Sequence, residues 1–197
     1  MDSADLDPDP HVQFDRWYAE AAAAGVSQPD RMALATATAA AVPSVRMVLL
    51  KGHDPRGFVF YTNLESRKAR ELDANPRAAL ALHWESQNRQ VRVEGAVERL
   101  GEQESSAYFM TRPYDSRLAA WASPQSQRIE RAELQRRFEE IEVRFDGVDE
   151  VPLPPFWGGY RVGADAIEFW QGQPNRFHDR VRYDRDGDGW SRYRLGP

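Results

Sequence analysis

Four cationic side chains lie close together in the sequence between positions 44 and 68. They are Arg46 and Lys51, in an apolar run, and Arg67 and Lys68, which follow Ser66. The run is typical of a strand, and Ser66 is typical of the start of a helix. Backbone N–H groups at a helix start, together with Arg and Lys side chains, form a good site for an anion, most naturally a phosphate. The same pattern is compatible with an amphipathic hairpin whose charges are simply solvated.

A second set of groups suited to phosphate lies between positions 108 and 116. Tyr108 and Arg112 are four residues apart, on one face of a predicted helix, and Ser116 follows at the next turn or helix start. A phenol, a guanidinium and a hydroxyl that converge can bind a phosphate group. The alternative is a helix with one arginine whose charged end reaches solvent.

Three basic groups alternate with other residues near the end of the chain. Arg176, His178 and Arg180 are separated by Phe177 and Asp179. If this segment is extended, the three basic groups share one face. A lone histidine is commonly a satisfied, partly buried residue, but three basic groups on one face of an acidic protein favour a functional surface.

Composition excludes several classes of function. The length of 197 residues suits one domain, with 41% apolar and 29% charged residues. The net charge of −5 argues against nucleic-acid binding. The absence of cysteine excludes disulfides and thiol chemistry, and the four scattered histidines make a metal site improbable, so we expect no metal. No apolar run is long enough to span a membrane and the acidic N-terminus is unlike a signal peptide, so we expect a cytoplasmic protein.

One segment resembles a calcium-binding loop. Asp184 to Gly189 matches the first six positions of an EF-hand loop. The twelfth position is Leu195 where glutamate is needed, and the flanking segments are typical of strands. We interpret this segment as a charged hairpin turn.

The elements that position these groups are mainly short strands. Strands are predicted over 31–38, 44–51, 57–63, 77–84, 89–97, 160–162, 167–171, 181–184 and 190–194. Turn residues at 53–57 predict that 57–63 pairs with 44–51. Two final hairpins are predicted, one joining 160–162 to 167–171 and one joining 181–184 to 190–194. Short strands at this spacing favour an antiparallel barrel over βαβ units.

Helices are predicted at about 10–24, 65–74, 102–121 and 128–145, with an interruption of the third at Arg112-Pro113. Asp9 and Pro10 form a typical helix start. The acidic residues 1–9 are expected to be flexible, and residues 10–197 are expected to form a single domain. The predicted class is therefore mainly β with added α-helices (α+β).

Six short sequence motifs resemble those of one known family. They are Arg46-Met-Val-Leu-Leu-Lys51, Phe58-Val-Phe-Tyr-Thr-Asn63, Ser66-Arg-Lys68, Trp170-Gln-Gly172, Arg176-Phe-His-Asp-Arg180 and Arg194-Leu-Gly-Pro197. Together they resemble the pyridoxine (pyridoxamine) 5'-phosphate oxidase family, from about Phe14 to Pro197. The resemblance implies an antiparallel Greek-key split β-barrel of the FMN-binding type. It also implies a homodimer with FMN at the interface, so that one site draws on both chains.

The resemblance implies a role for each matching residue. The FMN site would comprise Arg46, Met47, Val48, Leu49, Leu50, Lys51, Tyr61, Thr62, Arg67, Lys68, Gln90, Gln125, Ser126, Trp170 and Arg180. Lys51, Tyr108, Arg112 and Ser116 would hold the substrate phosphate. Arg176 and His178, the expected catalytic residues, would contact the pyridine end of the substrate. Two features depart from the family pattern: fewer residues precede the first helix than in many members, and Phe177 stands where leucine is commoner.

The reaction that the resemblance implies is the FMN-dependent oxidation of pyridoxine or pyridoxamine 5'-phosphate to pyridoxal 5'-phosphate, in vitamin B6 metabolism. Oxygen would be the acceptor and hydrogen peroxide a product. One alternative is a related flavin oxidase of another aromatic substrate, such as a dihydrophenazine; such relatives tend to lose the substrate-phosphate residues that are present here. Another is an FMN-binding module without turnover. No nucleic acid or membrane is expected as a partner.

Overall fold

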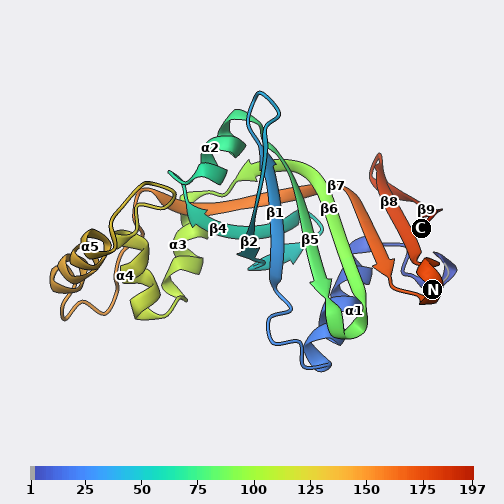
Figure 1. Cartoon of the computed structure of the whole chain (residues 1–197), viewed down its shortest axis with the longest axis horizontal. Helices are drawn as coiled ribbons and strands as arrows, with labels where there is room; N and C mark the ends of the chain where they lie inside the picture. The colour runs from blue at the N-terminus through green and yellow to red at the C-terminus, as the bar shows by residue number, and fades with distance from the viewer. Residues whose placement is uncertain (1–2) are drawn as a thin grey trace.

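Nine antiparallel strands form one sheet in the computed structural model, which describes residues 3–197 (Figure 1). The strand order is β2-β1-β5-β6-β7-β4-β3, and β8 and β9 extend the sheet beyond β7. The strands are β1 Arg31–Ala37, β2 Pro43–Leu49, β3 Gly52–Asp54, β4 Gly57–Asn63, β5 Arg77–Trp84, β6 Arg89–Arg99, β7 Trp157–Gln171, β8 Asp179–Asp186 and β9 Gly189–Leu195. The predicted antiparallel split barrel with added helices is confirmed.

Five α-helices accompany the sheet in the described part of the chain. They are α1 Pro10–Ala23, α2 Arg67–Ala74, α3 Glu102–Met110, α4 Tyr114–Ala122 and α5 Arg131–Arg144, with short 3-10 turns at η1 Ser3–Asp5, η2 Glu85–Gln87 and η3 Pro174–Arg176. The predicted run 102–121 is divided into α3 and α4 at Pro113, which has no N–H to continue a helix. Figure 1 shows α3, α4 and α5 at one end of the molecule, and β8, β9 and both termini at the other.

Strand β7 is the longest strand and connects the two ends of the sheet. Its first part, Trp157–Val162, pairs with β4, and its last part, Ala166–Gln171, pairs with β8. Between them the register with β6 shifts, and Asp165 is the extra residue of a bulge. Gly95 on β6 allows this approach, because a Cβ there would lie 1.8 Å from the carbonyl oxygen of Gly163.

The predicted hairpin between 160–162 and 167–171 is therefore wrong. Both segments belong to β7, and a bulge takes the place of the expected turn. A bulge inserts one residue without reversing the chain, so sequence patterning that searches for turns does not distinguish the two. The last predicted hairpin is present as β8 and β9.

The predicted pairing of 44–51 with 57–63 is also wrong. In the ladder, β2 pairs with β1, whereas β4 pairs with β7 and with the short strand β3. The turn after Asp54 closes only the β3–β4 hairpin. The chain passes from β2 to β3 through Leu50, which is buried, and Lys51, whose backbone N–H donates to the Val59 carbonyl at 2.8 Å.

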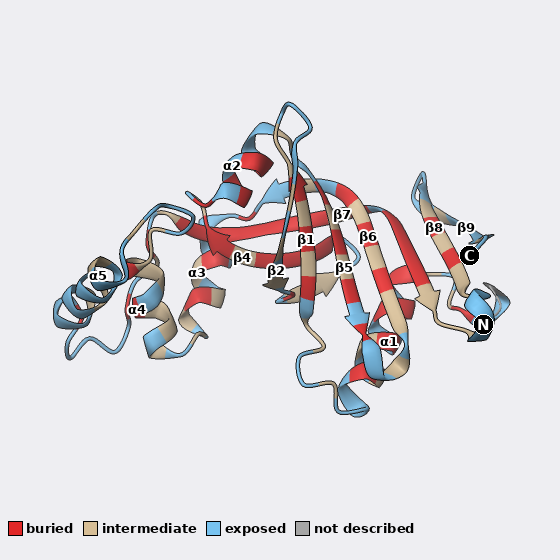
Figure 2. Ribbon diagram, viewed as in Figure 1, coloured by how far each residue is buried: buried red, intermediate tan, exposed pale blue. Residues whose placement is uncertain are grey.

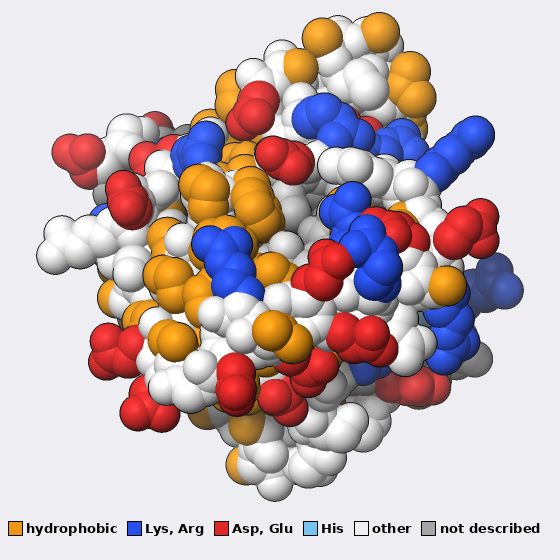
Figure 3. Space-filling model, turned by 90° about the vertical axis from the view of Figure 1, so that its left-hand side faces the viewer, with side chains coloured by type: hydrophobic (Ala, Val, Ile, Leu, Met, Phe, Trp, Pro, Cys, Tyr) orange, Lys and Arg blue, Asp and Glu red, His pale blue; other side chains and the backbone are white. Residues whose placement is uncertain are grey.

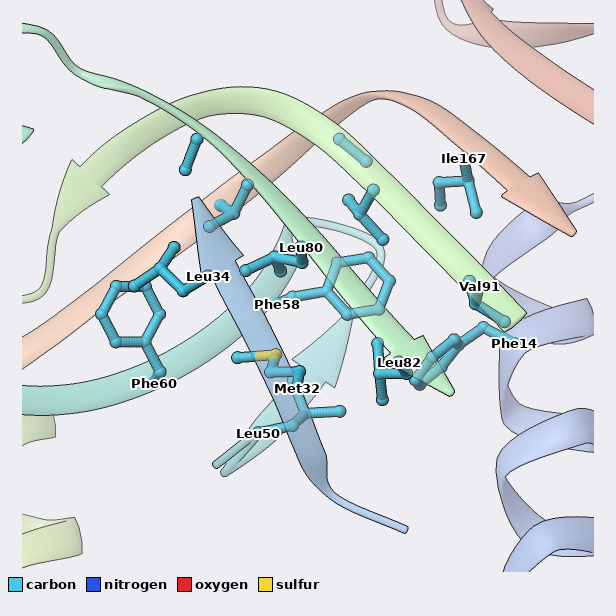
Figure 4. Packing of buried hydrophobic residues seen from close by; sticks show 14 of the residues in the cluster. Phe14, Met32, Leu34, Leu50, Phe58, Phe60, Leu80, Leu82, Val91 and Ile167 are labelled. Carbon is cyan, nitrogen blue, oxygen red and sulfur yellow. The ribbon is translucent and has the colours of Figure 1, made fainter. Parts of the chain in front are cut away.

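The core lies on the concave side of the sheet and is closed by α1. Phe14 on α1 and Phe58 on β4 are fully buried, with ring centroids 4.9 Å apart. Figure 4 shows these rings among Leu80, Leu82 and other apolar side chains of the strands. Each fully buried side chain of this size contributes about 1.5–3 kcal/mol of transfer free energy. The predicted helix start is present: the Asp9 side chain accepts the His11 backbone N–H at 2.8 Å.

The N-terminal segment is attached to the last hairpin. Leu6 belongs to the core cluster, and its carbonyl accepts Arg192 Nη1 at 2.6 Å. The Asp7 carbonyl accepts the Tyr183 hydroxyl at 2.7 Å. The flexibility predicted for 1–9 stays a prediction; in the structure a buried side chain and two backbone acceptors attach Leu6 and Asp7 to the hairpin, and residues 1–2 lie outside the described residues.

Helix α5 lies outside the core. None of its residues is buried (Figure 2), and Glu133 forms ion pairs with Arg136 and Arg137. Figure 3 views this end of the molecule and shows acidic and basic side chains interspersed with apolar ones. Among residues 3–197, no helix has the length and apolar character needed to cross a membrane.

His11, in the first turn of α1, is buried against aromatic rings. It is 5% exposed, and neither ring nitrogen has a hydrogen-bond partner among the described residues. The ring stacks on Phe58 at 5.9 Å and meets Trp190 at 5.8 Å. Burial lowers the His11 pKa below its usual 6.5; nearby Arg185 acts in the same direction, and Asp9 opposes it.

Replacing His11 by phenylalanine is expected to remove an acid-dependent loss of stability. Below pH 6.5 the unfolded chain takes up a proton that folded His11 resists, so stability falls with falling pH by at most about 1.4 kcal/mol per pH unit. In His11→Phe this slope should be smaller. Urea unfolding between about pH 7 and 4.5 measures it, with the exposed His83→Gln as the control. An unchanged slope in His11→Phe contradicts the assignment.

Candidate functional site

A cavity of about 760 Å³ lies where β2, β4, α3 and α4 meet. This volume is in the usual range for small-molecule sites. Of the predicted site residues, those that line the cavity are Arg46, Met47, Val48, Leu49, Lys51, Tyr61, Thr62, Lys68, Tyr108, Arg112, Ser116 and Gln125. The structure therefore brings both predicted sets of phosphate-binding groups into one cavity.

Lys68 supplies a buried cation to the cavity. Its ammonium donates to the Thr62 hydroxyl at 3.0 Å, the Ser66 hydroxyl at 3.3 Å and the Gln125 amide oxygen at 2.8 Å. Burial, helped by nearby Arg46, lowers the Lys68 pKa to about 8. Because these three acceptors are uncharged, they do not neutralise the ammonium, and an anion in the cavity would be favourable.

A buried carboxylate holds two of the predicted cations. Glu71 on α2 is 4% exposed and accepts Arg46 Nη2 at 3.3 Å, Arg67 Nε at 2.8 Å and the hydroxyls of Thr36 and Ser44. Burial opposes ionisation, but these hydrogen bonds lower the Glu71 pKa to about 2. The sequence analysis did not identify Glu71, although its position four residues after Arg67 on one helical face was an available signal.

Arg112 lies at the α3–α4 side of the cavity. Because α3 ends at Met110, Arg112 does not continue the helical face of Tyr108 as predicted, yet both residues line the cavity. The Arg112 guanidinium lies over the rings of Trp157, at 4.9 Å, and Phe109, at 5.4 Å. Burial lowers its pKa. Its Nη1 is buried without a hydrogen-bond partner among the described residues, so an anionic acceptor would satisfy it.

Stacked aromatic rings form one wall of the cavity. The Tyr61 ring lies 4.0 Å from Tyr108 and 5.3 Å from Trp157, with interplanar angles of 9° and 4°. A flat, rigid aromatic surface is well suited to a planar ligand ring. The sequence analysis did not identify Trp157, and its position as the first residue of a strand after a proline-rich segment offered only a weak signal.

Five other predicted site residues form a second group, which we call the C-terminal cluster. It comprises Gln90, Trp170, Arg176, His178 and Arg180. Trp170 lies opposite Gln90 on β6 and opposite Arg180 on β8, and its ring lies 4.7 Å from that of His178. Arg176 is exposed in the short turn η3. The cluster therefore lies around the C-terminal end of β7.

The cavity and the C-terminal cluster are far apart on one chain. Trp157 and Trp170 are both on β7 and are 13 positions apart (170 − 157). At about 3.3 Å per residue, this separation corresponds to roughly 40 Å along the strand, somewhat less with the bulge and the curvature. Figure 1 shows the two ends of β7 on opposite sides of the molecule. A single chain does not bring these groups together.

Arg176, His178 and Arg180 were predicted to share one face if their segment is extended, and this condition is not met. Asn175 and Arg176 have φ of 56° and 63°, so this segment turns and is not extended. Arg180, in contrast, lies on β8 and donates to the buried carboxylate of Glu168 at 2.8 and 3.2 Å. Arg176 and Arg180 are therefore presented by different backbone conformations.

His178 is oriented by the backbone of the same turn. Its Nδ1 accepts the Gln173 N–H at 3.2 Å. A ring nitrogen that accepts a hydrogen bond carries no proton, so the neutral ring has its proton on Nε2. The Gln173 side chain also donates to Asp179 at 2.7 Å and holds the turn together. Neutral His178 therefore presents a donor at Nε2.

Besides the C-terminal cluster, three further predicted residues do not line the cavity. Leu50 is in the core, Arg67 begins α2 and pairs with Glu71, and Ser126 follows Gln125 with φ of 68°. Lys51 does line the cavity, and its Nζ also contacts Asp30 at 2.8 Å.

Comparison with known proteins finds matches over nearly the whole chain. A family model described as Pyridoxamine 5'-phosphate oxidase matches residues 18–150, and one described as Pyridoxine 5'-phosphate oxidase C-terminal dimerisation region matches residues 157–197. A Rubrobacter xylanophilus protein is 59% identical over 192 residues, covering 97% of this chain and 88% of its own. A Burkholderia thailandensis protein is 53% identical over 201 residues, covering 100% and 93%. Both are named pyridoxine/pyridoxamine 5'-phosphate oxidase.

Solved structures show the same architecture. PhzG from Burkholderia lata 383, in complex with tetrahydrophenazine-1-carboxylic acid, superposes with a TM-score of 0.93 at 34% identity, covering 99% of this chain and 96% of its own. A pyridoxamine 5'-phosphate oxidase-related, FMN-binding protein from Nostoc punctiforme has a TM-score of 0.74 at 18% identity, covering 98% and 100%. The second similarity concerns the fold alone.

Replacing Glu71 by glutamine is expected to destabilise the protein by about 1–3 kcal/mol at pH 7, because Arg46 and Arg67 lose a charged acceptor. Glu71 has its pKa lowered from 4.5 to about 2, so its contribution is complete above pH 4.5 and is lost as pH falls through about 2. The difference in unfolding free energy between wild type and Glu71→Gln should therefore stay constant above pH 4.5 and decrease as the pH falls towards about 2.

Denaturant unfolding across pH measures this difference. The exposed Glu133→Gln on α5 is the matched control, because it also removes a carboxylate from two arginines. It should have little effect, since exposed pairs contribute little. Equal losses in the two variants would contradict a special role of the buried carboxylate.

Proposed function

This chain belongs to the pyridoxamine 5'-phosphate oxidase family, and from that premise we propose that it oxidises pyridoxine 5'-phosphate or pyridoxamine 5'-phosphate to pyridoxal 5'-phosphate. Oxygen is the acceptor and hydrogen peroxide a product; with the amine substrate, water hydrolyses the imine that forms first and ammonia is released. The observation that carries this proposal is the single cavity with two sets of phosphate-binding groups, one around Lys68 and one around Arg112. The names of relatives at 53–59% identity support it.

The residues of the cavity fit FMN. Lys68 is a buried cation with uncharged partners, which suits the flavin phosphate, and Arg46 lies beside it. Thr62 and Gln125 already converge on the Lys68 ammonium and would border the same ligand. When bound, FMN would supply the acceptor for a hydride and the reaction with oxygen. The protein would supply binding, orientation and electrostatics.

The second set of groups holds the substrate. Arg112 would take the substrate phosphate with its unpaired Nη1, assisted by Ser116, Tyr108 and Lys51, which line the same cavity. Two anchored phosphates fix the two ligands relative to each other. Orientation of this kind supplies up to about 7–11 kcal/mol of the barrier reduction in well-aligned intramolecular reactions.

A second copy of the chain supplies the C-terminal cluster. Because that cluster lies far from the cavity on its own chain, the proposed reaction requires a homodimer in which the cluster of one protomer faces the cavity of the other. The matched dimerisation region spans the whole cluster except Gln90. Val45 and Met47 on β2 are 69% and 58% exposed, which is unfavourable for apolar side chains unless a partner covers them.

Arg176 and His178 act as donors toward the pyridine end of the substrate. A guanidinium does not lose its proton in proteins, so Arg176 is no base. Neutral His178 presents Nε2–H, because its Nδ1 accepts the Gln173 N–H. The substrate loses a hydride from carbon and a proton from its hydroxyl or amine. With both side chains as donors, the proton leaves to solvent while they hold and orient the oxygen or nitrogen.

A reduced phenazine-like ring is a second candidate substrate. The similarity to PhzG, which holds a tetrahydrophenazine carboxylic acid, is the observation in its favour. A phenazine carboxylic acid has no phosphate, and it would leave the Lys51–Arg112–Ser116 side of the cavity without its best ligand. We therefore place the phosphorylated pyridine first.

The purified protein with FMN, in air, should convert pyridoxine 5'-phosphate to pyridoxal 5'-phosphate and hydrogen peroxide in equal amounts. In Arg112→Ala the loss of a charged hydrogen bond should raise KM by roughly 10- to 100-fold. Oxidation of unphosphorylated pyridoxine, which offers no phosphate to Arg112, should be the same in the variant as in the wild type. Arg117→Ala is the matched control, because that arginine lies over Tyr114 and does not line the cavity. An FMN-bound protein that oxidises only dihydrophenazines would overturn the proposal.

A further inference from the structure

Arg112 is partly buried and is held differently from Arg161 and Arg180. Arg161, which is 3% exposed, pairs with Asp54 and Glu104, and Arg180 pairs with Glu168. No carboxylate of residues 3–197 forms a salt bridge with Arg112. Its guanidinium instead lies over two aromatic rings, and its Nη1 has no acceptor among these residues. The rings are therefore what determines where this cation lies.

Trp157 is the nearer of the two rings around the guanidinium, and the sheet holds it in place. It is 8% exposed, it is paired with Asn63 in the β4–β7 ladder, and its backbone N–H donates to the Pro154 carbonyl at 3.0 Å. The ring packs against Phe109 at 5.0 Å, edge to face, and lies parallel to Tyr61. The Arg112 guanidinium lies 4.9 Å from the centroid of the Trp157 ring and 5.4 Å from that of Phe109. Trp157 thus offers a fixed ring face to a flexible arginine.

An aromatic face holds a cation in a way that a carboxylate does not. A carboxylate would compete with an incoming phosphate for the N–H groups of Arg112 and would cancel its charge. A ring attracts the guanidinium through its quadrupole and leaves the N–H groups at the edge available. The geometry therefore keeps Arg112 both positioned and uncompensated.

We propose that Trp157 is a positioning residue for the substrate phosphate, acting by holding the Arg112 guanidinium at the phosphate end of the cavity. This inference rests on the proposed function of Arg112. It assigns to Trp157 a role in substrate affinity through Arg112. It does not assign it a role in the chemical step.

The test is a kinetic comparison of Trp157→Phe and Trp157→Leu in the FMN-loaded enzyme. A cation–π contact of about 0.5–2 kcal/mol corresponds to a rise in KM for pyridoxine 5'-phosphate of roughly 2- to 30-fold in Trp157→Leu. Trp157→Phe, which keeps a smaller ring, should show a smaller rise. The turnover number should change by less than about twofold, and the inhibition constant of inorganic phosphate should rise in parallel with KM.

A double-mutant cycle separates positioning from general structural damage. Once Arg112 is replaced by alanine, Trp157→Phe should have no further effect on KM, because no cation is left for the ring to hold. Trp121→Phe is the matched control: Trp121 lies under Arg144 at 4.7 Å in the same kind of contact but does not line the cavity. It should leave KM unchanged. FMN affinity and thermal unfolding report whether each variant is folded. If Trp157→Leu does not fold, the comparison rests on Trp157→Phe alone.

Two outcomes overturn the inference. One is an unchanged KM in both Trp157 variants of an active enzyme. The other is a KM effect of Trp157→Phe that is equally large in the Arg112→Ala background, which would assign Trp157 a contact of its own. Failure of the proposed function has a different signature, since the wild-type protein would then not oxidise pyridoxine 5'-phosphate at all.

Discussion

Strand β7 hydrogen-bonds to β4 with its first half, to β8 with its second half and to β6 along both. A strand cannot bend back on itself within these ladders, so the residues at its two ends stay far apart. Trp157 at one end belongs to the cavity, and Trp170 at the other belongs to the C-terminal cluster. This separation is the constraint on which the proposed site depends: the two groups can meet only between two copies of the chain.

Two cations of the cavity, Lys68 and Arg112, have no carboxylate partner among residues 3–197, although the whole chain carries a net charge of −5. Lys68 is held by uncharged oxygen atoms and Arg112 by aromatic rings. The carboxylate that positions Arg46 is Glu71, which lies buried behind it and outside the cavity lining. Each cation is thus oriented without a carboxylate in the place where a phosphate would bind. This arrangement raises the affinity of the cavity for anions at the expense of folding stability.

The sequence was informative where a pattern is local. Strand alternation predicted the antiparallel barrel, and cation spacing together with the family motifs predicted both sets of phosphate-binding groups that the cavity brings together. It failed at Asp165, where a bulge replaces a turn, and at Gly52–Asp54, a three-residue strand. It also missed Glu71 and Trp157, whose importance arises from contacts between elements. Roles assigned to Arg176 and His178 stay predictions, because their proposed partners are on another chain.

The most direct test of the two-chain site is a hybrid dimer of Arg112→Ala and Arg176→Ala protomers, purified with two different tags. If the cavity of one chain faces the cluster of the other, this hybrid contains one intact site and should retain about half of the wild-type activity, although each parent homodimer is impaired. A hybrid of wild type with the double variant should then be impaired at both sites. The reverse pattern, with activity only in the second hybrid, would contradict the account by placing the whole site within one chain.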